Sequence, residues 1–204
     1  MSNENATTVL LCGVGGQGTI LAADLLAHAA LAAGTSVKVS EIHGMAQRGG
    51  AVTTVVRFGD EVSSMVCDPG TADCVVSFET TEALRNLPFL AEDGYLLVAD
   101  EAIKPLPVAT GRASMPALAR ETLADRGATL IPAGELAREA GSAKSVNVVL
   151  LGALSTRLPF APEAWERVVA DRVPPKTVEA NLEAFRAGLA FAREAEGREG
   201  GDQA

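Results

Sequence analysis

The 204-residue chain has few of the residues that build metal centres. It contains two histidines and three cysteines, and Cys12, Cys67 and Cys74 are irregularly spaced. Two histidines exclude a multi-histidine metal site, and three scattered cysteines cannot supply the four thiolates that an iron–sulfur cluster normally needs. An odd number of cysteines also suggests no disulfide framework. If this protein takes part in electron transfer, another chain carries the electrons.

The sequence also lacks a positive charge excess and any long apolar run. Its 17 Lys and Arg residues are outnumbered by 26 Asp and Glu residues, which gives a net charge of −9. Nucleic acids and anionic membranes need a basic surface, so neither is an expected partner. No apolar run is long enough to span a membrane, and the polar start, residues 1–5, does not resemble a secretory leader. We therefore expect a cytoplasmic protein.

Aromatic residues make up only 4% of the chain, whereas Ala and Leu are frequent, which favours helices packed on a sheet over a β-sandwich. Predicted strands alternate with predicted helices, and this order is typical of an α/β fold. The strands are expected at residues 8–12, 36–40, 51–58, 72–78, 95–99 and 128–131, with a turn at 92–94 and a possible hairpin strand at 62–66. The helices are expected at residues 19–33, 79–86, 115–126, 134–140, 145–156, 162–170 and 177–196, with an extended linker at 104–107.

This alternation predicts one α/β domain, a three-layer Rossmann-like fold whose mostly parallel sheet carries helices on both faces. The expected boundaries are a flexible N-terminus at residues 1–7, a single domain at 8–196 and a disordered tail at 197–204. The helix at 145–156 is apolar almost all round, so we expect it to be buried against the sheet or against a partner chain.

A glycine-rich loop organises the first part of the chain. The apolar run of residues 8–12 is followed by Gly-Val-Gly-Gly-Gln-Gly, the strand–loop–helix opening of a nucleotide-binding βαβ unit. Gly13 would permit the tight turn, Gly15 would let backbone approach a ligand, and Gly18 would let the helix pack on the strand. The first helical amides would attract an anion. The candidate ligand-binding residues here are Gly13, Gly15, Gly16, Gln17 and Gly18.

The glycine loop is not specific by itself, because many α/β proteins use such glycines only to turn a strand into a helix. A phosphate-loop NTPase is excluded, since Thr19 stands where that motif requires lysine. No Gly-x-Ser-x-Gly motif is present. Asp93-Gly94 matches only a fragment of a thiamine-diphosphate motif and indicates a turn. The chain alone therefore looks like a binding or docking module without a complete active site.

Residues 41–50 form a second dense feature, Glu-Ile-His-Gly-Met-Ala-Gln-Arg-Gly-Gly. An acid at the end of the second strand could accept hydrogen bonds from a ribose. The imidazole could act as acid or base, since its unperturbed pKa is ~6.5, or it could brace the loop. The guanidinium could clamp a phosphate or carboxylate, or brace its own loop. The candidate residues are His43 as the catalytic candidate, and Glu41, Gln47, Arg48 and Gly49 for ligand binding.

The two loops should lie side by side, because both leave the carboxyl ends of predicted strands. Together they carry a resemblance that neither carries alone. The Gly-Gly-Gln-Gly loop and the stretch Ser-Glu-Ile-His-Gly-Met-Ala-Gln-Arg-Gly-Gly at residues 40–50 resemble the gamma-type domain of the 2-oxoacid:ferredoxin oxidoreductases. The second stretch is similar to the small subunits of the indolepyruvate branch. The resemblance continues through residues 55–59, 147–152 and 181–185, and so covers nearly the whole chain.

The resemblance implies a small subunit of an enzyme that oxidatively decarboxylates aryl pyruvates such as indolepyruvate. Coenzyme A is the co-substrate, the products are an aryl-acetyl-CoA and carbon dioxide, and two electrons reduce ferredoxin. It further implies that thiamine diphosphate, magnesium and the iron–sulfur clusters belong to a large (alpha) subunit, and that this chain holds no cofactor alone. Ferredoxin would meet the complex rather than this chain.

On this resemblance, the two loops face the large subunit across its active-site mouth. Arg48 would hold a coenzyme A phosphate or a partner carboxylate, and His43 and Gln47 would shape the pocket. Three alternatives remain at this point. The chain could be a stand-alone nucleotide-binding protein, a gamma subunit for another 2-oxoacid, or a structural subunit that touches no ligand.

Overall fold

The computed structural model describes residues 6–43, 50–104 and 106–201. A six-stranded sheet in the order β2-β3-β1-β4-β5-β6 forms the middle layer. Strand β3 runs antiparallel to both of its neighbours, and the pairs β1–β4, β4–β5 and β5–β6 are parallel. Five strands therefore share one direction, and the predicted α/β fold with a mostly parallel sheet is confirmed. The strands are β1 Ala6–Val14, β2 Ser36–His43, β3 Ala51–Gly59, β4 Ala72–Ser77, β5 Leu90–Ala99 and β6 Thr129–Ile131.

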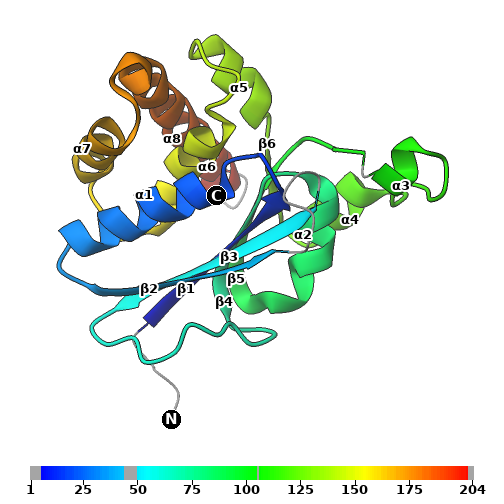
Figure 1. Cartoon of the computed structure of the whole chain (residues 1–204), viewed down its shortest axis with the longest axis horizontal. Coiled ribbons are helices and arrows are strands. Elements are labelled where there is room, and N and C mark those ends of the chain that lie inside the picture. The colour runs from blue at the N-terminus through cyan, green and yellow to red at the C-terminus, as the bar shows by residue number, and fades with distance from the viewer. Residues whose placement is uncertain (1–5, 44–49, 105, 202–204) are drawn as a thin grey trace.

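Helices cover both faces of the sheet (Figure 1). One face carries α1 Thr19–Ala32, α5 Ala133–Glu139, α6 Val146–Leu154, α7 Pro162–Arg172 and α8 Val178–Gly201. The other carries α2 Thr80–Asn86 and α4 Ala119–Ala124, while the short α3 Leu106–Ala109 stands to the side. Three 3₁₀ turns complete the chain, at η1 Leu87–Phe89, η2 Ser155–Arg157 and η3 Pro175–Thr177.

The strand alternation sorts side chains into two hydrophobic clusters. Val9 and Leu11 of β1 belong to the larger cluster, which also takes residues from α1, α6, α7 and α8. Leu10 and Cys12, from the alternate positions, join the smaller cluster with residues of α2 and α4. Successive side chains thus alternate between the two clusters, as expected for a strand that is buried on both faces. The turns that leave the strands therefore follow segments that are packed against hydrophobic residues on both faces.

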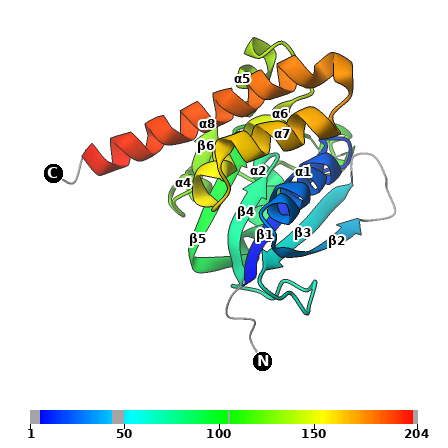
Figure 2. The ribbon, with the colours of Figure 1, turned by 90° about the vertical axis from the view of Figure 1, so that its left-hand side faces the viewer.

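Helices α6 and α8 cross at backbone contact. A Cβ on Gly152 would lie 2.0 Å from the Phe185 carbonyl oxygen, and one on Gly188 would lie 1.9 Å from the Val149 carbonyl oxygen. Every residue of α6 from Asn147 to Leu154 is buried. The apolar helix expected at residues 145–156 is therefore covered by its own chain. Figure 2 shows α8 lying along α6 and continuing beyond the body of the molecule.

The hairpin expected at residues 62–66 is wrong. β1 and β2 already occupy both edges of β3, so no edge remains for a returning strand. Instead the ammonium of Lys38 donates to the Ser63 carbonyl at 3.0 Å, and the guanidinium of Arg57 donates to the Val66 carbonyl at 3.1 Å. Two cationic side chains, one from β2 and one from β3, thus donate hydrogen bonds to backbone carbonyl groups that would otherwise need a strand partner.

Several element ends also differ from the expectations. The turn at residues 92–94 is wrong, because β5 already begins at Leu90 and a Cβ on Gly94 would meet the Ala72 carbonyl oxygen at 2.9 Å. The linker at 104–107 gives way to α3, and the helix expected from residue 115 begins at Ala119. The last helix runs to Gly201 and not to residue 196. The domain limits remain a prediction. None of the described helices combines the length and apolarity that crossing a membrane would need.

Candidate functional site

The turn from β1 into α1 is made by two glycines in left-handed conformations. Gly16 has φ +105° and Gly18 has φ +84°, values that side chains other than glycine rarely adopt. Gly18 is the N-cap of α1, and no side chain of the described residues forms a capping hydrogen bond there. Gly13 was expected to make this turn, and that is wrong, because it lies inside β1 and pairs with Val52. The turn thus sits three residues later than the motif suggested.

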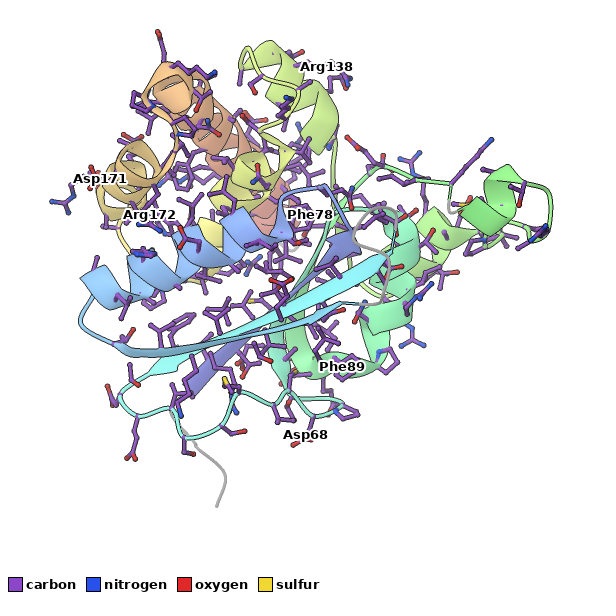
Figure 3. The ribbon with its side chains drawn as sticks, in the orientation of Figure 1. Asp68, Phe78, Phe89, Arg138, Asp171 and Arg172 are labelled. Atoms are coloured by element: carbon purple, nitrogen blue, oxygen red, sulfur yellow. The ribbon has the colours of Figure 1, made fainter. Side chains whose placement is uncertain are left out.

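Gln17 braces the glycine loop from within. Its Oε1 accepts a hydrogen bond from the Val14 amide at 2.7 Å, and its Nε2 donates to the Phe78 carbonyl at 2.9 Å. Figure 3 shows Phe78 beside the loop that leads into α1. A Cβ on Gly13 would come within 2.8 Å of Gln17 Oε1 and 2.9 Å of Phe78 Cβ. Gly13 therefore makes room for this brace, which ties β1 to the end of β4.

The two loops of the sequence meet at one backbone hydrogen bond. The Gly15 amide donates to the Gly50 carbonyl at 2.8 Å. This contact places Gly50, the last residue of the second loop, against the glycine loop, and it means that the Gly15 amide is engaged by protein. Gln47, Arg48 and Gly49 lie outside the described residues, so their roles remain predictions.

Glu41 and His43 belong to β2 and not to the loop. The strand continues three residues beyond its expected end at residue 40, because β3 offers partners as far as Val52, opposite His43. Glu41 is exposed and stands opposite Thr54. β3 separates β2 from β1, whereas in the dinucleotide fold the second strand lies directly beside the first. The strand order therefore places the acid away from the ribose position of a dinucleotide site.

A cavity of about 560 Å³ opens beside the glycine loop. It lies where β1 and β5 end, the edge at which sheets of this kind bind ligands. Glu101 follows β5, and its carbonyl accepts the Thr80 amide at 2.9 Å. Lys144 precedes α6 and is exposed. The lining residues are Gly16, Gln17, Gly18, Leu21, Glu101, Ile103, Ala143, Lys144, Val146 and Asn147.

Two charged residues of this cavity escaped the sequence reasoning. Neither Glu101 nor Lys144 forms an ion pair with another residue among those the structure describes. Glu101 carried a usable signal, because it comes two residues after the end of a buried strand, at the ligand edge. No sequence signal indicated Lys144, because its position at the cavity depends on how α6 packs in the fold. Within the described part of the chain, the cavity is thus lined by a carboxylate and an ammonium that have no ion-pair partner there.

Asn147 connects α6 to the glycine loop. Its Nδ2 donates to the Gly18 carbonyl at 3.2 Å, across 129 residues of sequence, and its Oδ1 accepts the Val148 amide at 3.0 Å. A Cβ on Gly18 would lie 2.8 Å from Asn147 Nδ2. Gly18 therefore serves the contact between α1 and α6, and not the helix-on-strand packing that was expected.

Comparison with known proteins decides which family this site belongs to. The family model described as pyruvate ferredoxin/flavodoxin oxidoreductase matches residues 8–191, which is nearly the whole chain. This chain belongs to that oxidoreductase family. The predicted resemblance to this group is confirmed. Members of the family are enzymes, so the chain is part of an oxidoreductase.

Relatives within the oxidoreductase family span the chain almost end to end. The chain is 41% identical to an indolepyruvate oxidoreductase subunit IorB from Thermococcus kodakarensis, over 91% of this chain and 96% of that protein. It is similar in fold to the gamma subunit of a keto/oxoacid ferredoxin oxidoreductase from Geobacter sulfurreducens, with a TM-score of 0.69, 26% identity and coverage of 92% and 99%.

The same fold also occurs as part of a longer chain. A 2-oxoglutarate:ferredoxin oxidoreductase from Magnetococcus marinus matches with a TM-score of 0.71 and 24% identity. The match covers 94% of this chain but only 32% of that one. The oxidoreductase fold seen here is thus found both as a separate chain and as a unit within a larger one.

The cysteines of this oxidoreductase chain do not fit an iron–sulfur cluster. Burial raises the pKa of Cys12 to about 12 and that of Cys74 to about 12, so both are protonated thiols at neutral pH. Burial also raises the pKa of the half-buried Cys67, against the hydrogen bond with Thr71. Cys12 and Cys74 also belong to separate hydrophobic clusters, so the two thiols do not face a common site. Among the described residues no group of three His, Cys, Asp or Glu could hold a metal ion.

Proposed function

We propose that this chain is the small subunit of an indolepyruvate oxidoreductase. The complete enzyme oxidatively decarboxylates aryl pyruvates with coenzyme A, forms an aryl-acetyl-CoA and carbon dioxide, and reduces ferredoxin. The observation that carries this proposal is the 41% identity to an IorB subunit over 96% of that protein's length. At this level of identity along the whole chain, the shared role is favoured over a role shared only by fold.

In this proposal the redox chemistry belongs to a large subunit. That partner carries thiamine diphosphate, magnesium and iron–sulfur clusters, and ferredoxin docks to the complex. The burial of Cys12 and Cys74 in two separate hydrophobic clusters supports this division, because these two thiols do not share one site. The occurrence of the same fold inside a longer oxidoreductase chain also supports it. The site of action is the cytoplasm.

The ligand edge of the sheet faces the large subunit in this arrangement. The glycine loop and the cavity beside it lie at this edge, and Gly50 adjoins them through its hydrogen bond with Gly15. Arg48 holds a phosphate of coenzyme A there, and His43 and Gln47 shape the pocket. Lys144, which has no described ion-pair partner, adds positive charge on the cavity side. An anion would also be favoured by the N-terminus of α1.

Changing Arg48 to Ala tests the assignment of the anion. In the assembled enzyme the variant should raise the apparent KM for coenzyme A about tenfold or more, because a charged hydrogen bond to phosphate is lost. The apparent KM for indolepyruvate should stay unchanged. Arg112→Ala is the matched control, since Arg112 is an exposed arginine away from the cavity lining.

The other outcomes of this test assign Arg48 differently. An unchanged KM with weaker subunit association would mean that Arg48 binds a carboxylate of the partner. Normal kinetics with normal association would mean that Arg48 only braces its own loop.

A stand-alone dinucleotide-binding protein is the competing function. It predicts that the purified chain alone binds a dinucleotide or flavin, which isothermal titration calorimetry would detect. The strand order argues against it, because β3 separates Glu41 from the glycine loop strand. A structural subunit without ligand contacts predicts that every substitution in the two loops changes assembly only. The kinetics of Arg48→Ala separate that alternative from the proposal.

A further inference from the structure

Two walls of the cavity beside the glycine loop come from distant parts of the chain, and Glu101 and Ile103 complete the lining. One wall is the loop itself with the start of α1, and the other is the segment from Ala143 to Asn147 that leads into α6. Lys144 lies on the second wall. The relative position of Lys144 and the N-terminus of α1 therefore depends on what holds the two walls together.

Asn147 makes a side-chain hydrogen bond between these walls. It is 3% exposed, and its side-chain amide forms two hydrogen bonds. The Oδ1 atom accepts from the Val148 amide, and the Nδ2 atom donates to the Gly18 carbonyl. The Gly18 carbonyl also accepts the Ala22 amide at 3.0 Å, the first hydrogen bond of α1. The Asn147 contact is thus added to the helical bond and does not replace it.

The helix behind Asn147 is closely packed. Gly152 and Gly188 bring the backbones of α6 and α8 into direct contact, which leaves no space between the two helices. Asn147 lies at the end of α6 that lines the cavity. A hydrogen bond from its side chain can therefore transmit the position of the α6–α8 pair to the glycine loop.

We propose that Asn147 is a positioning residue of the oxidoreductase: it fixes the glycine loop against the segment that bears Lys144, so that the cavity is preformed for coenzyme A. This inference rests on the proposed function. It assigns Asn147 no contact with the reacting atoms. Preorganisation lowers the cost of binding, so loosening the cavity should weaken coenzyme A binding more than it slows the bound complex.

Asn147→Asp is the variant that isolates the contact. The side chain keeps its size and can still accept the Val148 amide, but an oxygen replaces the donor that faces the Gly18 carbonyl. Asn181→Asp is the matched control, because Asn181 is 7% exposed and its Nδ2 donates locally to the Thr177 carbonyl at 2.8 Å. Asn147→Ala, which adds no charge, is a second variant that tests the same contact.

Two readouts test the proposal. Hydrogen exchange of the purified chain should show faster exchange of the amides of residues 18–22 in Asn147→Asp and Asn147→Ala, but not in Asn181→Asp. In the assembled enzyme, both Asn147 variants should raise the apparent KM for coenzyme A about tenfold, while kcat stays within about twofold and subunit association is unchanged. Asn181→Asp should leave the KM at the wild-type value.

Two results would overturn the positioning role. One is unchanged exchange at residues 18–22, and the other is faster exchange with an unchanged KM for coenzyme A. A KM raised equally by Asn181→Asp would also overturn it, because the effect would then be general destabilisation. Inactivity of the wild-type pair would instead overturn the proposed function, and the exchange readout would still decide whether Asn147 holds the loop.

Discussion

Glu82 is a carboxylic acid that the fold keeps away from water. It is 5% exposed, its Oε2 has no hydrogen-bond partner among the described residues, and its Oε1 lies 3.5 Å from the exposed guanidinium of Arg85. Burial raises its pKa, against the opposing effect of Arg85 and with a further increase from Glu79. The folded chain therefore holds this proton more tightly than the unfolded chain, and an ionised Glu82 costs stability at pH 7.

Glu82→Gln should stabilise the protein in a pH-dependent way. Stability from the protonated acid is present below the unfolded pKa and is lost as the pH rises through the raised folded pKa. The Gln variant should gain up to about 1 kcal/mol at pH 7 and little near pH 4. Urea unfolding at both pH values, followed by fluorescence of the single tryptophan, Trp165, measures this. Glu92→Gln, an exposed position, is the control and should show no such gain.

Sequence reasoning at the residue scale found the glycine loop but not how it is held. The glycines predicted a turn, but the residues with a left-handed backbone conformation are Gly16 and Gly18 and not Gly13. Gln17 was predicted as a ligand-binding residue, and the structure shows its amide bound to Val14 and Phe78. Phe78 lies 61 residues away, and no local pattern reveals such a partner. Contacts of this kind follow from the fold and cannot be read from spacing.

At the scale of elements, the crossing of α6 and α8 fixes the wall that carries Asn147. Gly188→Ala should destabilise the protein by about 1–3 kcal/mol, because its Cβ would fall 1.9 Å from the Val149 carbonyl oxygen and force the helices apart. Gly197→Ala, on the same helix, is the control, since a Cβ there meets nothing within 4 Å.

The control should move in the opposite direction. Alanine is the better helix former by about 1 kcal/mol, so Gly197→Ala should be neutral or stabilising. Urea unfolding of both variants gives the comparison. Equal effects at the two positions would contradict the close-contact account of α6 and α8.

Most elements were predictable because their hydrophobic periods are clear, and the misses have physical causes. β2 runs past Ser40 because a pairing register with β3 continues to His43. The expected hairpin strand has no free edge to join, as β1 and β2 flank β3. Both errors concern pairing between strands, which a single sequence does not specify. α6 was correctly expected to be buried, although only the structure shows that α8 covers it.

At the scale of the whole molecule, the proposal orients the ligand edge toward the large subunit. Substitution of two exposed aliphatic residues of α1 tests this orientation. Ile20 is 61% exposed beside the glycine loop, and Leu31 is 53% exposed near the opposite end of the helix. They are eleven residues apart, which is roughly 16 Å along a helix.

Ile20→Asp should weaken association with the large subunit about tenfold or more, because a charge would replace apolar contact at the interface. Leu31→Asp changes the net charge equally and should leave association unchanged. Titration of the large subunit with each variant measures the two dissociation constants. A stronger effect of Leu31→Asp would place the partner at the other end of the sheet.

The assembly-dependent assay tests the central claim most directly. The large subunit is expressed with and without this chain, and the reduction of ferredoxin or a viologen dye by indolepyruvate plus coenzyme A is followed. Activity is expected only when both chains are present. Equal activity of the large subunit alone, or failure of the two chains to associate, would contradict the account.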